Sequence, residues 1–147
     1  MTPLLPNSPG SYALLLYLPR RMSIAIGRLG CRNFKRGYYL YVGSAFGPGG
    51  IKARVQRHLA KDKKQHWHID YFRSLAKMKA VWVDSSPIRR EHQWAQALLV
   101  SAVACSPIDQ FGCSDCTCPS HMFYFKICPD ISILPRGNDP LAQVEIK

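Results

Sequence analysis

Arg54 and His58 are a pair whose types and spacing suggest chemistry. They lie four residues apart in a segment with apolar residues at Ile51, Val55 and Leu59, which is the spacing of an amphipathic helix. Side chains four residues apart on a helix lie side by side and can converge on one target. Because the pair flanks the apolar stripe, it suits a site at a sheet edge. The alternative is a boundary arginine whose stem packs on the core while its charge reaches water.

Glu91 is the carboxylate with the most informative position. Trp94, Ala95, Leu98 and Ala102 follow it at i+3, i+4, i+7 and i+11, so Glu91 is in register with the apolar face of a predicted helix. A carboxylate rarely occupies such a face without a partner, and a metal ion or an arginine would serve. The alternative is an ion pair in the first helical turn, where a glutamate also suits the helix dipole.

Tyrosines and glycines precede the Arg54 helix. Tyr39 and Tyr41 share one face of a predicted strand, and Gly43 follows on that face, where backbone or a ligand can approach closely. The alternative is that the strand tyrosines only pack in the core. The set of predicted phosphate-binding positions is Gly43, Ser44, Gly49, Gly50 and Lys52.

The loop Gly47-Pro48-Gly49-Gly50 supplies part of this set. Free backbone N–H groups at the start of the helix, with the helix dipole and Lys52, could hold a phosphate. No Gly-Lys-Ser/Thr follows, so the loop is not a Walker A motif. The alternative is a flexible turn.

The overall charge favours a polyanionic partner. The 147 residues include 20 Lys+Arg and 9 Asp+Glu, a net charge of +11, and nucleic acid is the commonest polyanion that proteins bind. The apolar content of 47% argues against a disordered chain. The prolines of the first ten residues do not suit a signal peptide, and the apolar run over 12–18 is too short to span a bilayer. We therefore expect a cytoplasmic protein with no membrane partner.

The elements that must position these residues alternate between strands and helices. Periodicity and turn residues predict strands at 11–18, 22–28, 38–44, 80–83 and 121–127, and helices at about 50–60, 67–76 and 86–104. The third helix is predicted to begin with Ser86 as N-cap and Pro87 as its first residue. Loops are predicted at 29–37 and 111–119.

The expected fold is α/β (α+β), a mixed or antiparallel central sheet of three to five strands with about three flanking helices. Its domain is 10–128, after a flexible lead-in at 1–9 and before an irregular tail at 129–147.

Taken in order, these residues resemble the GIY-YIG nuclease superfamily. The matching segments are Gly10-Ser11-Tyr12, Tyr41-Val42-Gly43-Ser44-Ala45, Arg54-Val55-Gln56-Arg57-His58 and Glu91. Ser11 stands where the family has Ile, and three extra residues separate Tyr41 from Arg54 compared with a compact member. The stretches 39–58, 64–72, 90–98 and 111–123 resemble more closely the Uri-type branch, which in some proteins accompanies an endonuclease III domain.

The resemblance implies a metal-dependent endonuclease that hydrolyses phosphodiester bonds in nucleic acid, DNA more than RNA. Glu91 would hold one Mg²⁺ or Mn²⁺ ion. Tyr12 would accept the proton of the attacking water as a tyrosinate, if the metal and Arg54 lower its pKa. Arg54 would neutralise charge in the transition state, and Tyr41 and His58 would orient water or phosphate. The alternative is a domain that keeps the fold and binds nucleic acid without cleaving it.

Further histidines, an aspartate and cysteines form an accessory set. His66 and His68 diverge if they lie on a helix, so capping and packing are favoured over joint metal binding. The zinc-type residues are Cys113, Cys116, Cys118 and His121. Four ligands within nine residues are tight for a tetrahedral site, so free thiols beside the active site, with Asp115 as a polar contributor, are favoured over zinc. A zinc-containing interaction domain is the third hypothesis.

Overall fold

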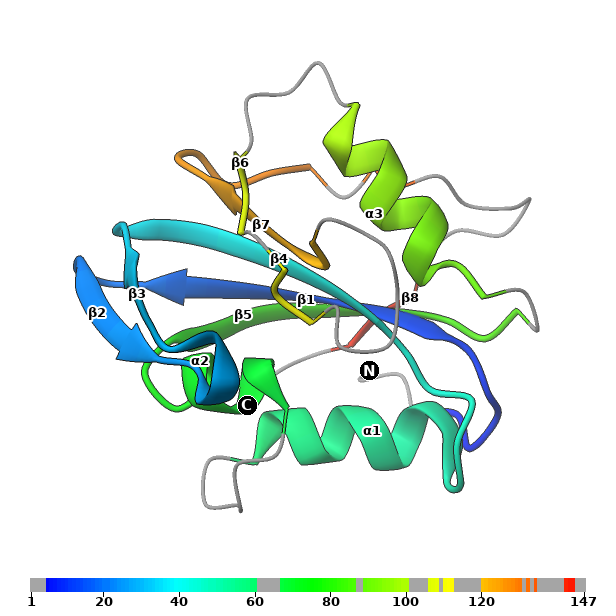
Figure 1. Cartoon of the computed structure of the whole chain (residues 1–147). Coiled ribbons are helices and arrows are strands. Elements are labelled where there is room, and N and C mark those ends of the chain that lie inside the picture. Colours follow the sequence, from blue (N-terminus) through cyan, green and yellow to red (C-terminus); the bar gives the residue numbers. More distant parts are fainter. Residues whose placement is uncertain are drawn as a thin grey trace.

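An antiparallel sheet forms the centre of the molecule (Figure 1). The computed structural model describes residues 5–60, 67–86, 89–100, 106–108, 110–112, 120–130, 132, 134 and 142–144. The sheet has the strand order β6-β7-β4-β1-β5-β8. Its strands are β1 (Ser11–Leu18), β4 (Gly37–Ser44), β5 (Lys77–Asp84), β6 (Ser106–Pro107), β7 (Met122–Phe125) and β8 (Ala142–Val144). Four longer strands form the middle, and the two shortest strands form the edges, so the expected α/β class is confirmed.

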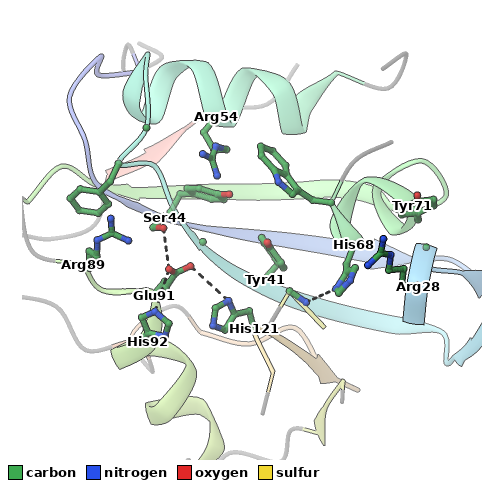
Figure 2. A pocket seen from close by; sticks show the side chains of 17 residues that line it. Arg28, Tyr41, Ser44, Arg54, His68, Tyr71, Arg89, Glu91, His92 and His121 are labelled. Carbon is green, nitrogen blue, oxygen red and sulfur yellow. Dashed lines mark hydrogen bonds and ion pairs between the residues drawn. The ribbon is translucent and has the colours of Figure 1, made fainter. Parts of the chain in front are cut away.

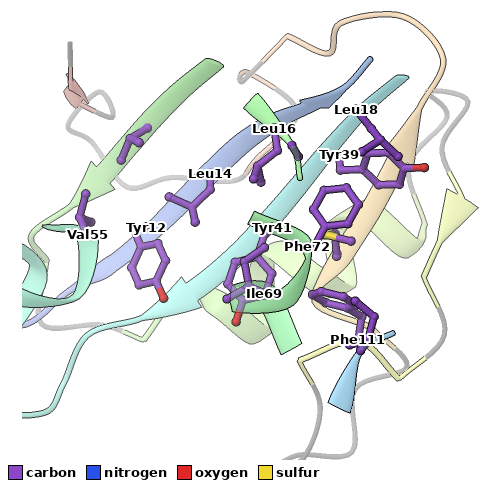
Figure 3. Close-up of a cluster of buried hydrophobic side chains, with 14 of the residues drawn as sticks. Tyr12, Leu14, Leu16, Leu18, Tyr39, Tyr41, Val55, Ile69, Phe72 and Phe111 are labelled. Carbon is purple, nitrogen blue, oxygen red and sulfur yellow. The ribbon is translucent and has the colours of Figure 1, made fainter. Parts of the chain in front are cut away.

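The central strand β1 explains the long apolar run near the start of the chain. β1 pairs antiparallel with β4 on one edge and with β5 on the other, and its side chains are buried on both faces of the sheet. Tyr12, Leu14, Leu16 and Leu18 point into one buried cluster (Figure 3), whereas Ala13 and Leu15 belong to a second cluster on the opposite face. A strand that is buried on both faces needs apolar residues without alternation.

The three helices divide between the two faces of the sheet. α1 (Gly50–Leu59) and α2 (His68–Arg73) lie on one side in Figure 1, and α3 (Glu91–Leu99) lies on the other. Ile51 and Val55 of α1 join the first cluster, whereas Trp94 of α3 joins the second. The apolar stripes predicted for α1 and α3 are therefore confirmed. None of these helices is long and apolar enough to cross a membrane, as far as the described residues go.

A two-stranded sheet corrects the predicted loop at 29–37. β2 (Met22–Ala25) pairs antiparallel with β3 (Cys31–Phe34), and a short 3-10 helix, η1 (Gly27–Leu29), connects them. In β3 only Phe34 is buried, so the strand shows no apolar alternation that a sequence pattern could detect. The predicted strand over 22–28 is correspondingly shorter.

The start of α3 also differs from the prediction. The helix begins at Glu91, not at Ser86, and the predicted first residue, Pro87, lies outside the described residues. Two contacts are made by the residues on either side of that gap. The Asp84 carboxylate accepts the backbone N–H of Ser86 at 2.8 Å, and the backbone N–H of Arg90 donates to the Ser11 hydroxyl at 2.9 Å. An aspartate that binds the amide two residues later favours a turn over a helix. At the chain end, β8 pairs with β5 within the tail that was expected to be irregular.

Candidate active site

A cavity of about 920 Å³ lies beside β4 and gathers most of the predicted site residues (Figure 2). The predicted residues that line it are Tyr12, Tyr41, Gly43, Ser44, Arg54, His68, Glu91 and His121. They come from β1, β4, α1, α2, α3 and the segment before β7. The fold therefore brings together side chains from six separate elements.

Tyr12 reaches the cavity because residue 43 has no side chain. The two residues are directly opposite each other in the β1–β4 pairing. A Cβ atom at position 43 would lie 2.5 Å from both Cζ and the hydroxyl oxygen of Tyr12. The close approach expected at Gly43 is thus made by the Tyr12 ring. The same glycine also lines the cavity.

Tyr12 and His58 form a buried hydrogen-bonded pair. The Tyr12 hydroxyl lies 2.7 Å from Nε2 of His58, and both side chains are almost fully buried. Burial raises the pKa of Tyr12 above its ordinary value, and the neighbouring Arg54 guanidinium opposes the rise only in part. The protein side chains by themselves therefore favour the neutral phenol of Tyr12 near pH 7, and the tyrosinate that the resemblance implies would depend on the bound metal ion.

Tyr41 lines the cavity and is almost completely buried in its wall. Its ring is 9% exposed and makes edge contacts with the rings of His58 and Phe111. Burial raises the pKa of Tyr41 well above its ordinary value, and the nearby Tyr12 adds to the rise. Tyr41 is therefore also a neutral phenol that can donate or accept a hydrogen bond.

Arg54 is held by an aromatic ring at the rim of the cavity. Its guanidinium carbon lies 4.5 Å from the centre of the Trp67 ring, which is a cation–π contact. Arg57 lies 4.6 Å from the same ring and forms a 2.6 Å ion pair with Asp70, but it does not line the cavity. The Arg54 side chain thus packs on the domain and presents its charge to the cavity at the same time.

A buried arginine that the sequence did not single out fixes the end of α1. Arg73 donates from Nε to the carbonyl oxygen of His58 at 2.9 Å and from Nη2 to that of Leu59 at 3.1 Å. A third bond runs from Nη1 to the carbonyl oxygen of Ala76 at 3.0 Å. Since the last carbonyls of a helix lack partners within the helix, this guanidinium caps α1 and holds the backbone of His58 in place.

Glu91 faces the cavity from the first residue of α3. Its side chain is 14% exposed, and Oε1 accepts a hydrogen bond from the Ser44 hydroxyl at 3.0 Å. Nε2 of His92 lies 3.5 Å from Oε1, and Nδ1 of His121 lies 3.7 Å from Oε2 (Figure 2). Ser44 and two histidines are therefore the observed partners of the carboxylate, in place of the arginine that the sequence left open.

The donor atoms near Glu91 suit a hydrated divalent cation. Within the described ranges, no group of three or more His, Cys, Asp or Glu side chains could hold a metal ion. Mg²⁺ commonly binds one or two carboxylates and keeps several waters, so it does not need such a group. A single carboxylate in a polar cavity fits a cation of that kind, and it does not fit one that requires an all-protein cage.

Ser11 links the first strand to the metal-binding candidate. This fully buried residue accepts the backbone N–H of Arg90 on its hydroxyl, and the Arg90 side chain donates from Nε to Asp84 at 2.7 Å. The residue that precedes Glu91 is therefore tied to both β1 and β5. The serine at the position where the family has isoleucine therefore contributes a hydrogen bond that an isoleucine could not make.

The glycine loop before α1 does not form the predicted phosphate site. The backbone N–H of Gly50 donates to Gly47, and the N–H groups of Ile51 and Lys52 donate to the carbonyl oxygens of Ser8 and Pro6, at 3.0 and 2.9 Å. The prediction of free N–H groups is therefore wrong for Gly50 and Lys52. Gly49, Gly50 and Lys52 all lie outside the lining of the cavity. The segment expected to be a flexible lead-in accepts the N–H groups of Ile51 and Lys52.

Two of the accessory histidines reach the cavity as neutral rings. Nδ1 of His68 accepts the backbone N–H of Gly112 at 2.9 Å, so its proton is on Nε2. Burial lowers the pKa of His68, and the charge of Arg32 lowers it further. Burial also lowers the pKa of His121, although Glu91 opposes that shift. The other accessory and zinc candidates, His66, Cys113, Asp115, Cys116 and Cys118, lie outside the described residues.

Residues 11–134 match a family described as Domain of unknown function DUF123. The chain belongs to this family. DUF123 is a GIY-YIG-like family, in agreement with the motifs around Tyr12, Tyr41, Arg54 and Glu91. No curated protein and no solved structure matches the chain.

The cavity of the DUF123 domain is also lined by residues that no sequence pattern indicated. These additional lining residues are Gly27, Arg28, Phe46, Trp67, Tyr71, Arg89, His92 and Gly112, and Gly47 of the predicted glycine loop also lines the cavity. Most of them lie in loops or at the ends of short elements, where no periodic pattern marks a face. Of these residues, Arg89 and His92 could best have been proposed from the sequence, because they lie within two positions of Glu91.

Proposed function

We propose that this DUF123 domain is a metal-dependent endonuclease of the Uri type that hydrolyses phosphodiester bonds in nucleic acid, with DNA as the expected form. The observation that carries the proposal is that Tyr12, Arg54 and Glu91 line one cavity although they come from three different elements. The net charge of +11 would attract a polyanionic substrate to the domain.

The Tyr12–His58 pair offers a route for the proton of the attacking water. In the tautomer with an unprotonated Nε2, His58 accepts the Tyr12 proton across the 2.7 Å contact. The Tyr12 oxygen then takes the proton of the water as the water oxygen bonds to phosphorus and the bond from phosphorus to the leaving ester oxygen breaks. In this route Tyr12 is never a long-lived tyrosinate, which agrees with the raised pKa that burial gives it.

Arg54 and Tyr41 complete the groups that face the phosphate. Arg54 projects its charge into the cavity beside Tyr12, where it stabilises negative charge that grows on the phosphate oxygens. Tyr41, as a neutral phenol, donates a hydrogen bond to a phosphate oxygen or to the water. The Trp67 ring keeps the Arg54 guanidinium in place before substrate arrives.

Glu91 is the residue that would hold Mg²⁺ or Mn²⁺. Such an ion supplies Lewis-acid polarisation of the phosphate and stabilisation of the leaving oxygen when it is bound. Ser44 orients the carboxylate by donating to Oε1, which leaves the second oxygen toward His121. The chain thus contributes one oriented carboxylate within a cavity that is also lined by histidine and arginine side chains.

Nicking of DNA by the purified protein tests the proposal. Supercoiled plasmid, branched duplex and single-stranded DNA are incubated with Mg²⁺ or Mn²⁺, and products are resolved on gels. We expect cleavage that requires the divalent ion and falls about 10²- to 10⁴-fold in Tyr12→Phe, which removes the proton-transfer group. Glu91→Gln should lose the metal-dependent activity. Lys52→Gln removes an exposed charge outside the cavity and serves as the matched control. Cleavage that is equal in all three variants would contradict the assignment.

A binding domain without catalysis is the second candidate function. It is favoured by the net charge of +11, which attracts a polyanion whether or not the domain cuts it. This hypothesis expects affinity for nucleic acid that weakens steeply with salt, because phosphate contacts release counterions. It also expects that no DNA or RNA substrate is cut at any Mg²⁺ or Mn²⁺ concentration, which separates it from the endonuclease.

A further inference from the structure

The cavity carries an arginine and an aromatic ring at each of its two ends. In Figure 2, Arg89 lies at one side of the view and Arg28 with Tyr71 at the other, with Glu91, Tyr41 and Arg54 between them. Sites for small ligands span about 300 to 1,000 Å³. The volume of about 920 Å³ is therefore large enough for more than one nucleotide unit.

Phe46 is the aromatic ring at the first end. It lies in the loop after β4, two residues beyond Ser44, and its side chain is half-buried. The guanidinium carbon of Arg89 lies 4.6 Å from the centre of the Phe46 ring. Because Arg89 is itself exposed, this end of the cavity offers a cation and an apolar surface together.

Tyr71 is the aromatic ring at the second end. It lies on α2 and is half-buried, and its ring packs against η1. Residue 27 approaches so closely that a Cβ atom there would lie 3.3 Å from Cε2 of Tyr71. The next residue, Arg28, is exposed and lines the same cavity. The second end thus repeats the combination of a supported aromatic ring and a cation.

The reactive groups lie at the floor of the cavity. Tyr12 is 1% exposed and Tyr41 is 9% exposed, so a phosphate must enter the recess to reach them. A duplex is stiff, with a persistence length of about 150 base pairs, and keeps its bases stacked inside. A single strand bends easily, and its bases are free to stack on aromatic rings or on arginine planes.

We propose that the cavity binds a single-stranded segment of nucleic acid, with one unpaired base against Phe46 and another against Tyr71. The arginines beside the two rings contact the flanking phosphates, and the phosphate between the two bases enters the recess. The inference rests on the proposed function in one respect, namely that the central phosphate is the one placed near Tyr12 and Glu91. The ends of the cavity then select substrates with unpaired nucleotides, such as single strands, flaps or loops.

Equilibrium binding without cleavage tests this selection. The Glu91→Gln protein, in chelator and at fixed salt, is titrated into fluorescein-labelled probes of about 16 nucleotides. The probes are single-stranded DNA, single-stranded RNA of the same sequence and a blunt DNA duplex, and anisotropy reports binding. We expect one or both single strands to bind at least about tenfold more tightly than the duplex, since base stacking on aromatic rings is open only to unpaired bases. The difference between the two single strands shows which backbone the cavity prefers.

Variants of the two rings complete the test. In the same background, Phe46→Leu and Tyr71→Leu should each lower single-strand affinity about 5- to 150-fold and leave duplex affinity unchanged. Phe46→Tyr and Tyr71→Phe keep the aromatic face and should retain binding, and thermal unfolding identifies any variant that fails to fold. Equal or tighter binding of the duplex, or unchanged single-strand affinity in either folded leucine variant, would overturn the proposal. Because no cleavage is measured, these outcomes are independent of whether the wild-type protein cuts DNA.

Discussion

The hydroxyl oxygen of Ser11 accepts a hydrogen bond from the backbone N–H of Arg90 at 2.9 Å, although 79 positions separate the two residues. The contact joins the start of the central strand to the residue before Glu91. The carboxylate that is proposed to hold the metal is thus located by a bond that starts next to Tyr12. Two groups of the candidate site therefore depend on one buried serine.

Ser11→Ala should weaken both the fold and the site. The variant leaves the buried N–H of Arg90 without its acceptor, which costs about 1–3 kcal/mol in free energy of unfolding. Because the start of α3 loses this anchor, we also expect a higher Mg²⁺ concentration for half-maximal nicking. Urea denaturation and a metal titration measure the two effects. Ser23→Ala, at an exposed serine on β2, is the matched control and should change neither. A Ser11→Ala protein with wild-type metal dependence would show that the bond does not position Glu91.

Gly43→Ala should destabilise the protein by overpacking. The new Cβ atom would lie 2.5 Å from Cζ and the hydroxyl oxygen of Tyr12, and the fully buried ring has no space to move away. We expect a loss of about 1–3 kcal/mol in free energy of unfolding. Gly47→Ala is the control, because the nearest atom to its added Cβ would be Nη2 of Arg54 at 3.7 Å. Chemical denaturation of the two variants should separate them clearly, and equal stabilities would contradict the packing of Tyr12 against residue 43.

A sequence pattern identifies a site residue when the residues that reveal its position are close neighbours along the chain. Helical periodicity within a dozen residues predicts Arg54, His58 and Glu91 beside an apolar stripe. In the structure Arg54 and Glu91 line the cavity, whereas His58 is buried against Tyr12. The occupied N–H groups of Ile51 and Lys52 could not be predicted, since their acceptors, Ser8 and Pro6, lie more than 40 residues earlier in a segment without periodicity.

Elements whose partners lie far away in the sequence were likewise not predicted. Strand β3 has only Phe34 buried, and β8 has just three residues, so neither carries an alternating pattern long enough to identify. In the sequence, Arg73 is a polar residue at the end of a short predicted helix. Its three bonds to carbonyl oxygens form only when α1 and α2 pack together. These features follow from tertiary contacts, and local propensity does not encode them.

The stability of the fold should decrease as the pH falls below about 6.5, and His68 contributes to this decrease. Burial and Arg32 lower its pKa in the folded protein, whereas the unfolded chain binds the proton near the ordinary value of about 6.5. The unfolded state therefore holds more protons between the lowered pKa and 6.5, so acidification through this window favours unfolding. A protonated Nδ1 also could not accept the N–H of Gly112.

His68→Asn isolates this contribution, because an amide oxygen can accept the Gly112 N–H and does not titrate in this range. Urea denaturation at a series of pH values from 7.5 to 5 should show a shallower decrease in free energy of unfolding for the variant than for wild type. The decrease that persists is assigned in part to His121, whose pKa burial also lowers. Parallel profiles for the two proteins would exclude His68 as a source of the pH dependence.

Arg54→Lys and Arg57→Lys form a matched pair for the last prediction. Both arginines lie within 4.6 Å of the Trp67 ring, and both substitutions keep the positive charge. Lysine cannot reproduce the planar, multidentate contact of a guanidinium with a phosphate. Since only Arg54 lines the cavity, Arg54→Lys should lower kcat for nicking by about 10²-fold, the loss typical of removing one transition-state donor. Arg57→Lys should keep kcat near wild type, because Arg57 binds Asp70 instead of the substrate. If the two variants lost activity equally, the loss would be attributed to the guanidinium groups packed on Trp67, and a direct contact of Arg54 with the phosphate would be contradicted.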